Sequence, residues 1–346
     1  MKLFMKSDRQ LKIVLALSAF SDSIGGPVGY AVGLKKRLES AGVLVKIVCY
    51  DKLDKYPKGA RRLLFLCRLF RFALGSNIVY GFNLASSGLP ACLASWFLRK
   101  KLVIRLGGDF LWERAVEKGK IKETLQGYYR LKKSNQERFW LFVQKQILKR
   151  AHKIIFTTDF QKELYQRVFR LKLDRAVIIE NPFPRVDNES SNNNFQILYA
   201  GRLVRVKNID MLKNAVSQVK KQTTQSLTLK IIGENPMSHQ ELLQEISNSW
   251  LCVLPSLSEI SPNFALECIA LRKPILLTKE NGLNKAINEK LLLIDPKNQR
   301  DLERKILYLL DDENYQNYLS KIKQIDTSYS WQEVAEKHIL LFNGLN

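Results

Sequence analysis

The chain of 346 residues is expected to fold as an α/β protein with two doubly wound domains. Two observations predict this architecture. Short apolar runs, typical of buried parallel strands, alternate with longer amphipathic runs, typical of helices. The alternation is interrupted by the polar, Ser- and Asn-rich stretch 187–194, which indicates a linker between two parallel sheets.

The first half of the chain supplies the first series of strands and helices. Apolar runs of strand length stand at 12–17, 44–49, 78–80, 102–105, 153–157 and 177–179. Apolar residues three and four positions apart predict helices at 30–40, 59–73, 90–98 and 135–150. The run 13–20 lacks the cleavage site of a secretion signal, so a first strand is the better interpretation. The uncharged stretch 78–98 is interrupted by Asn83 and Pro90, which disfavours a membrane span.

The second half repeats the pattern. Strands are expected at 196–200, 228–232, 251–254 and 274–278, helices at 209–222, 240–248 and 263–271, and a last amphipathic segment at 330–342. We therefore assign residues 1–184, together with 329–346, to an N-terminal domain, and residues 185–328 to a C-terminal domain.

The balance of charge is strongly basic. The chain has 56 Lys and Arg against 33 Asp and Glu, a formal charge of +23, which favours nucleic acid, anionic lipid or a phosphorylated substrate as partner. Nucleic acid is the least favoured of these, because aromatic residues do not interleave with the basic ones as stacking platforms would require. The five cysteines are scattered in apolar contexts, which is typical of buried free thiols in a reducing compartment, and no Cys/His cluster has metal-ligand spacing.

Residues 255–267 are the most informative stretch. Glu259 and Glu267 stand eight positions apart, across a loop that leads from the apolar run 250–254 into the helical run 264–271. The carboxyl end of a strand next to a helix N-terminus is the usual ligand crevice of an open α/β sheet. A carboxylate accepts two hydrogen bonds from adjacent hydroxyls, so a ribose diol suits it. Helix capping alone and a hydrolase with paired carboxylates are the alternatives.

A second turn carries cations. Arg202 and Lys207 follow the apolar run 197–200 and its Gly201. A guanidinium can donate two parallel hydrogen bonds to phosphate oxygens, and an ammonium adds a point charge. Together they suit the diphosphate of a nucleotide sugar. No Asp-x-Asp motif is present, so no metal site is expected; ordinary surface charge is the competing interpretation.

Two features of the N-terminal half are weaker signals. Gly25 and Gly26 would let the backbone approach phosphates closely, or form a plain turn. Asp109, after a strand, is placed to meet an acceptor hydroxyl, or to cap the helix that starts near Leu111.

These motifs resemble the retaining glycosyltransferases of family 4. The residues that carry the resemblance are Gly201-Arg202-Leu203 with Lys207, the Glu-x7-Glu pattern Glu259 to Glu267 with Pro255, Ser256 and Pro262, Pro274, Gly25-Gly26-Pro27, Leu106 to Phe110 with Trp112-Glu113, and Ser330-Trp331. The resemblance implies the GT-B fold, with two Rossmann-like domains facing across a cleft and a last helix crossing back onto the N-terminal domain. It implies catalytic roles for Arg202, Lys207, Glu259 and Asp109, and donor binding by Gly25, Gly26, Gly233, Ser261, Pro262, Asn263 and Glu267.

The chain departs from the family pattern in one informative place. Family members usually have a helix and a strand between the turn after Gly233 and the Pro255 loop, and here residues 234–240 lead almost directly into the next helix. The missing piece would normally help to hold the nucleobase. Arg272 also replaces a glycine, and Gly107-Gly108 stands where a histidine is frequent.

Residues 61–72 combine large apolar side chains with four arginines. Such a segment suits either a half-buried core helix or attachment to an anionic bilayer, which we state as a hypothesis.

The sequence thus predicts a cytoplasmic, metal-independent retaining glycosyltransferase, peripheral at the inner face of the membrane. Its expected partners are a UDP- or GDP-sugar, a glycan or lipid-linked acceptor and an anionic membrane surface, with no cofactor, no metal and no nucleic acid. Cell-surface polysaccharide assembly is the expected setting, by resemblance. The alternatives are a non-catalytic binding protein on a degenerate scaffold, or a sugar-nucleotide epimerase or hydrolase.

Overall fold

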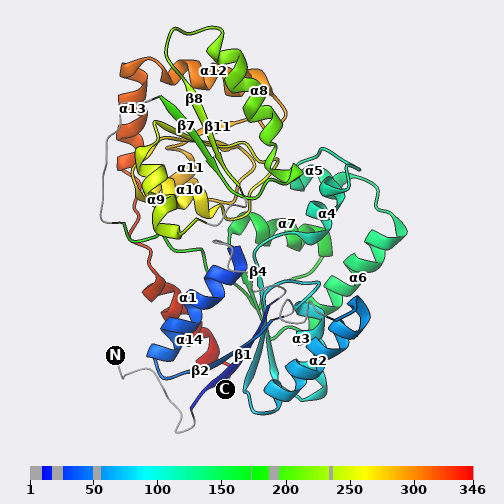
Figure 1. The fold of residues 1–346 in the computed structure, drawn as a ribbon. Coiled ribbons are helices and arrows are strands. Elements are labelled where there is room, and N and C mark those ends of the chain that lie inside the picture. Colours follow the sequence, from blue (N-terminus) through cyan, green and yellow to red (C-terminus); the bar gives the residue numbers. More distant parts are fainter. Residues whose placement is uncertain are drawn as a thin grey trace. The chain divides into compact units, whose positions relative to one another are not determined.

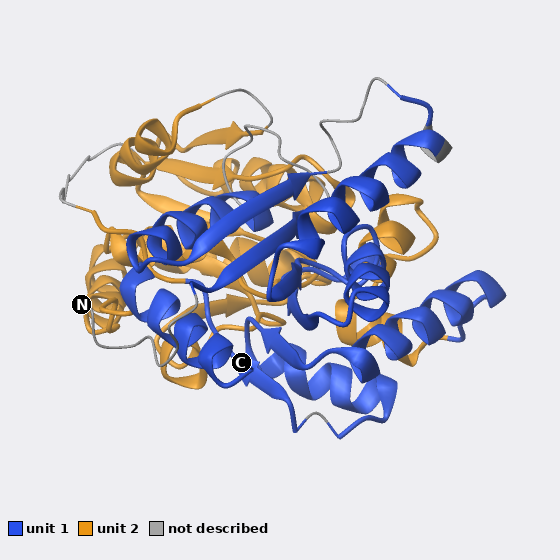
Figure 2. Ribbon diagram, turned by 90° about the horizontal axis from the view of Figure 1, so that it is seen from below, with its two compact units in different colours: residues 1–110, 132–181, 331–346 blue, residues 111–131, 182–330 orange. Residues whose placement is uncertain are grey.

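The structure, a computed structural model, describes residues 10–17, 26–49, 56–172, 174–186, 195–233 and 237–345. The chain divides into two compact units (Figure 2). Unit 1 comprises residues 1–110, 132–181 and 331–346, and unit 2 comprises residues 111–131 and 182–330. Each unit is built around its own parallel sheet, so the predicted α/β class is confirmed. Residues 111–131, which the sequence analysis places in the N-terminal domain, are grouped with unit 2. The expected linker 187–194 lies outside the described residues.

The sheet of unit 1 has six strands in the order β2-β1-β3-β4-β5-β6. Their bounds are Lys12–Leu17 (β1), Leu44–Cys49 (β2), Ile78–Gly81 (β3), Lys101–Leu106 (β4), Lys153–Phe156 (β5) and Ala176–Ile178 (β6). In the register of this sheet Ile13 of β1 is opposite Val45 on one side and Ile78 on the other. The chain leaves β1 in one direction and returns past it to β3, which is the doubly wound arrangement that the alternation predicted.

The helices of unit 1 cover both faces of this sheet. Their bounds are Gly26–Ser40 (α1), Lys58–Leu74 (α2), Gly88–Phe97 (α3), Asn135–Arg150 (α6), Asp159–Phe169 (α7) and Trp331–Asn343 (α14). Because parallel crossovers are right-handed, the reversal of direction after β2 puts α1 and α2 on opposite faces. In Figure 1, α14 lies against α1, whereas α3 lies against both α2 and α6. No described helix has the length and apolarity needed to cross a membrane.

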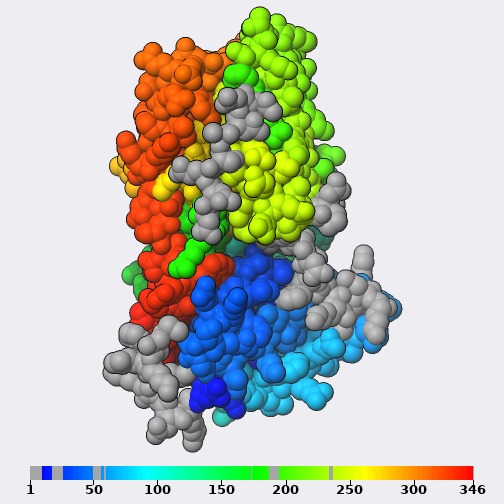
Figure 3. Space-filling view, turned by 60° about the vertical axis from the view of Figure 1, so that its left-hand side comes forward, coloured from blue at the N-terminus to red at the C-terminus, as the bar shows by residue number. Residues whose placement is uncertain are grey.

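The last helix returns to unit 1, as the resemblance implied. Trp331 packs on Gly33 of α1 so closely that a Cβ atom at Gly33 would lie 2.6 Å from the indole ring. Figure 3 shows the same arrangement, with the red C-terminal residues beside the blue of α1. Further along α14, the buried His338 contacts Tyr80 Oη of β3 through Nε2 at 3.0 Å. Its Nδ1 lies 2.7 Å from the carbonyl oxygen of Val334.

The sheet of unit 2 has five strands in the order β11-β10-β9-β7-β8. Their bounds are Gln196–Ala200 (β7), Thr228–Ile232 (β8), Leu251–Leu254 (β9), Ile275–Thr278 (β10) and Leu292–Ile294 (β11). Within the described residues β8 is an edge strand, and α9 follows it directly. This agrees with the departure noted in the sequence: one helix and one strand of the family pattern are missing between Gly233 and α9. Residues 234–236 themselves lie outside the described residues.

The helices of unit 2 include several that the sequence analysis did not predict. The predicted ones are Ile209–Lys220 (α8), His239–Asn248 (α9) and Asn263–Ala270 (α10). The others are Leu125–Arg130 (α5), Lys285–Asn288 (α11), Gln299–Leu309 (α12) and Asp312–Lys323 (α13), together with the strand β11. Helix α4 (Phe110–Glu117), which begins one residue before the expected Leu111, falls almost wholly in unit 2.

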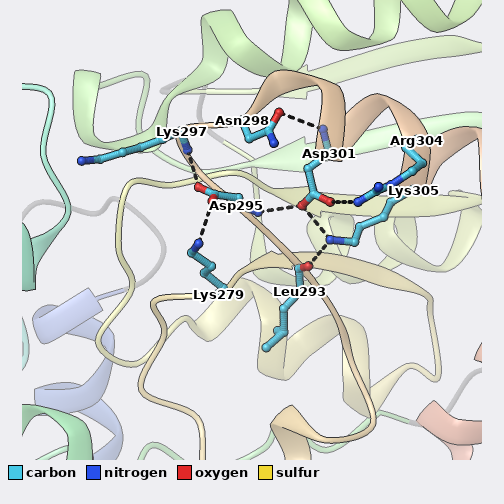
Figure 4. Close-up of polar contacts among 8 residues, drawn as sticks. All are labelled: Lys279, Leu293, Asp295, Lys297, Asn298, Asp301, Arg304 and Lys305. Atoms are coloured by element: carbon cyan, nitrogen blue, oxygen red, sulfur yellow. Dashed lines mark hydrogen bonds and ion pairs between the residues drawn. The ribbon is translucent and has the colours of Figure 1, made fainter.

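A network of charged side chains fixes the loop that leads into α12 (Figure 4). Asp301, in the first turn of α12, accepts hydrogen bonds from the Asp295 N–H at 2.9 Å and from Lys305 Nζ at 2.6 Å. Asp295 in turn accepts a hydrogen bond of 2.6 Å from Lys279 Nζ. Burial raises the pKa of the Asp301 carboxyl, but the hydrogen bonds from Lys305 and from the Asp295 N–H outweigh it, so this pKa lies below its usual value. The network therefore holds the loop that contains Pro296 in place.

All five cysteines are free thiols. Cys49, Cys92, Cys252 and Cys268 are buried, as the apolar contexts predicted. Cys67, on α2, is exposed, so the prediction of a buried thiol was wrong there. The reason is that α2 turns only one of its sides toward the sheet.

His338 should make the stability of the protein pH-dependent. Burial is the main reason why the pKa of His338 is lowered to about 3; the hydrogen bond to Val334 opposes this shift, and the nearby Arg105 charge adds to it. Between pH 3 and pH 6.5 the unfolded chain therefore binds one proton more than the folded chain, and stability is lost as the pH falls through this range. Lowering the pH from 7.5 to 5 should reduce the free energy of unfolding of the wild type. In His338→Gln we expect this reduction to be smaller by about 2 kcal/mol. Urea unfolding at both pH values measures this, and equal pH dependence in both proteins would contradict it.

Candidate functional site

The turn after β7 has a backbone that only certain residues can adopt. Gly201 has φ of +152°, and a Cβ atom there would lie 2.9 Å from Tyr199 Oη. The Tyr199 hydroxyl donates a hydrogen bond of 3.0 Å to the carbonyl oxygen of Arg202, which fixes the direction of the turn. A short 3-10 turn, Arg205–Lys207, follows, and Asn208 then enters α8 with φ of 55°. Arg202 and Lys207 thus lie on a strand-to-helix turn, as predicted.

Asn208 joins this turn to two neighbouring loops. Its side-chain Nδ2 donates to the carbonyl oxygens of Pro296 at 2.9 Å and Pro255 at 3.3 Å. A second link is the Leu257 N–H, which donates to Val206 O at 2.8 Å. The sequence analysis did not single out Asn208. The residue type was the only hint in the sequence that the backbone turns here, because asparagine tolerates the left-handed conformation better than most residues.

Lys207 and Glu259 meet at the carboxyl edge of the sheet. Glu259 lies in the loop between β9 and α10, and its Oε1 accepts hydrogen bonds from Lys207 Nζ and from Ser256 Oγ, both at 2.5 Å. The Glu259 side chain is only 9% exposed and that of Lys207 19%. A carboxylate so far removed from water needs such partners, because an unpaired buried charge is strongly destabilising. The structure therefore brings together a cation and a carboxylate that stand 52 positions apart in the sequence.

Arg202 has a carboxylate partner that the sequence analysis did not predict. Its guanidinium, at the surface, lies 3.4 Å from Glu113 Oε2 of α4. The next turn of α4 supplies Glu117, whose Oε1 accepts a hydrogen bond of 3.1 Å from the Val206 N–H. Residues 111–131 therefore put one carboxylate against Arg202, which we expected an anionic ligand to use, and another against the Val206 N–H. Local patterns gave no sign of this, because the contacts span 89 positions.

Glu267 is paired with a histidine. Its Oε1 lies 3.0 Å from Nε2 of His239, the first residue of α9. The hydrogen bond to this carboxylate raises the pKa of His239, although partial burial opposes the shift. His239 was not predicted as a site residue, because the histidines of the sequence lack metal-ligand spacing and no other pattern points to it.

The remaining predicted donor residues of unit 2 lie around the same loops. Gly233, at the end of β8, lies so close to Leu203 that a Cβ atom would come within 2.7 Å of its side chain. Pro262 precedes α10 and Asn263 begins it, so their peptide groups belong to the helix N-terminus, which favours anions. Ser261 and Asn263 are half-buried, and Pro262 is buried.

Three predicted site residues belong to unit 1. Gly26 begins α1 with φ of +69°, which favours glycine, and Gly25 lies outside the described residues. Asp109, directly before α4, is 2% exposed, and its Oδ2 accepts a hydrogen bond of 2.9 Å from Tyr165 Oη. The roles of these residues in a reaction stay predictions.

Within the described residues, no group of three or more His, Cys, Asp or Glu side chains is arranged to hold a metal ion.

Comparison of the sequence with known proteins finds matches to glycosyltransferases. The sequence profile of the glycosyl transferases group 1 family matches residues 194–312, which include the turn and loops described above. An uncharacterised glycosyltransferase of Methanocaldococcus jannaschii is 24% identical to the chain, covering 92% of it and 95% of the relative.

Solved structures share the fold. Sucrose-phosphate synthase from Thermosynechococcus elongatus superposes with a TM-score of 0.71 at 18% identity, covering 97% of this chain and 99% of its own. A glycosyltransferase from Rickettsia africae superposes with a TM-score of 0.65 at 14% identity, covering 97% and 98%. The sequence matches and the shared fold both point to glycosyltransferases. The chain therefore has the GT-B fold, and its residues 194–312 match the glycosyl transferases group 1 family.

Proposed function

We propose that this protein transfers a sugar from a UDP- or GDP-sugar to a hydroxyl group of a glycan or lipid-linked acceptor, with retention of the anomeric configuration and without a metal ion. One observation supports the proposal above the others. The turn that carries Arg202 and Lys207 is hydrogen-bonded to the loop that carries Glu259, at the carboxyl edge of a parallel sheet. This is where open α/β sheets bind ligands.

In this proposal the turn binds the diphosphate. The Arg202 guanidinium is 63% exposed in its weak pair with Glu113, so it is free to turn toward phosphate oxygens. Lys207 adds a second positive charge, already oriented by Glu259 and Ser256. Both cations favour the leaving diphosphate more as its charge grows, which lowers the barrier to transfer. The same charges make a bridging metal ion unnecessary, which is why we propose a metal-independent reaction.

The two glutamates bind the sugars. By resemblance, Glu267 is assigned to the ribose hydroxyls, and its carboxylate has a second oxygen besides the one facing His239. Glu259 is assigned to the donor sugar, where its charge also favours an oxocarbenium-like transition state. By resemblance, a phosphate oxygen of the leaving group takes the acceptor proton, and Asp109 orients the acceptor.

The setting we propose is the assembly of cell-surface polysaccharide or glycolipid at the cytoplasmic face of a membrane. It is supported by the family resemblance and by the formal charge of +23. The edge position of β8 favours one other candidate, a binding protein on a degenerate scaffold, since the element that would help to hold the base is missing. Product analysis with and without acceptor separates transfer from epimerisation or hydrolysis.

Removing a donor-site side chain should weaken nucleotide binding. We expect UDP or GDP to bind the wild type in EDTA, and Arg202→Ala and Glu267→Ala each to weaken binding at least about tenfold, because each removes a charge-assisted contact. Isothermal calorimetry with UDP, GDP and ADP measures this. Lys285→Ala is the matched control, since Lys285 is an exposed cation of unit 2 that pairs only weakly with Glu289.

The outcomes separate the candidates. Binding that requires added Mg²⁺ would contradict the metal-independent proposal. No binding of any nucleotide to the wild type would favour the degenerate scaffold.

Glu113 should compete with the donor for Arg202. We expect Glu113→Gln to tighten nucleotide binding about two- to fivefold, because an exposed ion pair of this kind contributes about 0.2–1 kcal/mol. The gain should shrink as salt is added, since salt weakens exposed ion pairs. Calorimetric titration at 50 and 500 mM salt tests both points, with Glu289→Gln as the control. Weaker binding by Glu113→Gln would show that Glu113 supports the donor site instead.

A further inference from the structure

Helix α2 has a buried side and an exposed side that is also apolar. Phe65, Leu69 and Ala73 are fully buried, and α2 packs on β1 and β2. This confirms the core-helix interpretation for one side of the segment 61–72. On the other side Leu63 and Leu74 are each 63% exposed, so packing in the core does not account for all the apolar residues of this helix.

The end of α3 continues this exposed apolar surface. Trp96 and Phe97 are its last two residues, 58% and 64% exposed. The ring of Phe97 lies 6.0 Å from that of Phe70 on α2, which joins the two helices. The guanidinium of Arg150, the last residue of α6, lies 5.6 Å from the centre of the Trp96 ring. The exposed aromatic pair therefore lies at the end of α3, the helix that packs against both α2 and α6 (Figure 1).

Helix α6 adds two further aromatic residues. Phe139 and Phe142 are 60% and 59% exposed, and their spacing of three puts them on the same side of the helix. Lys149, seven residues beyond Phe142, lies on that side too. At about 1.5 Å per residue, Phe142 lies about 12 Å along α6 from Arg150.

The charges on these helices are almost all positive. Their exposed cations, and those that follow α3, are Arg62, Arg68, Arg71, Arg99, Lys101, Arg138, Lys149 and Arg150. The only acidic residue in α2, α3 and α6 is Glu137, which is engaged in the capping box of α6 with Ser134. Exposed aromatic and aliphatic residues interspersed with arginine and lysine are typical of a helix surface that lies in the interface of an anionic bilayer.

We propose that the outer sides of α2, α3 and α6, here called the α2–α3–α6 surface, dock this protein on an anionic membrane. Trp96 and Phe97 enter the interfacial layer, and the surrounding cations contact lipid phosphates. This deepens the membrane setting of the proposed function, but it does not depend on the donor site. A second copy of the chain fits this surface less well, because a symmetric contact would bring the same positive charges together.

Vesicle sedimentation tests the proposal. We expect the full chain to bind sucrose-loaded vesicles of phosphatidylcholine with 30% phosphatidylglycerol, and to bind pure phosphatidylcholine at least about tenfold less. The double variant Trp96→Ser/Phe97→Ser should lose about tenfold or more, because it removes the apolar residues that enter the interface. Arg68→Glu/Arg71→Glu should lose a similar amount, and binding should fall with added salt. Leu340→Ser is the matched control, since Leu340 is 60% exposed but lies on α14.

Cys67 provides a second, independent readout. It is the exposed cysteine among the five, and it lies on α2, so a thiol-reactive environment-sensitive dye labels this surface. We expect its emission to shift to the blue with anionic vesicles and to stay unchanged with neutral ones.

Three results would overturn the proposal. The first is that the protein binds neutral and anionic vesicles equally well. The second is that Trp96→Ser/Phe97→Ser binds anionic vesicles as well as the wild type does. The third is that the wild type is a dimer in sedimentation velocity and the double variant is a monomer. The last would assign the surface to self-association. Failure here is distinct from failure of the proposed function, because Arg202→Ala should still bind vesicles, and Trp96→Ser/Phe97→Ser should still bind nucleotide.

Discussion

The ion pair between Lys207 and Glu259 is the constraint on which the candidate site depends. Both side chains are largely removed from water, and each satisfies the charge of the other. Removing one partner of such a pair typically costs about 3–5 kcal/mol, because the remaining charge stays buried without compensation. The pair therefore requires the turn after β7 and the loop after β9 to keep their places. Asn208 and the Leu257 N–H supply the additional hydrogen bonds that hold them there.

The same site is already surrounded by carboxylates. Glu113 and Glu259 pair with the two cations that the proposed reaction assigns to the diphosphate, and Glu117 and Glu267 engage the nearby Val206 N–H and His239. An anionic donor that binds here exchanges these partners for phosphate and hydroxyl groups. The net free energy of binding is then a difference between two sets of polar contacts. Exposed pairs such as Arg202–Glu113 are readily exchanged, whereas the buried Lys207–Glu259 pair is not.

Local patterns predicted the framework well, and the reason is physical. Buried parallel strands are mostly apolar runs, so β1, β2, β7 and β9 were predicted with the bounds that the structure has. The bounds of the partly buried edge strand β8 were predicted as well. Helix α6 was equally clear, because its apolar residues recur every three or four positions between a serine cap and Ala151. The elements between residues 285 and 323 were not predicted, although α12 and α13 are amphipathic.

The contacts between distant residues were not predictable in this way. The position of residues 111–131 is decided by Glu113, Glu117 and Leu125, whose partners lie more than eighty positions away. Periodicity carries no information on such contacts. The pairing of His239 with Glu267 is of the same kind, since it depends on how α9 packs on α10. The motif residues of unit 2 were identified from spacing and resemblance, whereas their partners became visible only in the structure.

A crystal structure of the protein with bound UDP or GDP tests the central claim most directly. The account predicts the diphosphate at the turn 201–208, with Arg202 turned away from Glu113 toward a phosphate oxygen, Lys207 within hydrogen-bond distance of the diphosphate, and the ribose hydroxyls on Glu267. A nucleotide bound elsewhere, with the Arg202–Glu113 and His239–Glu267 pairs intact, would contradict it.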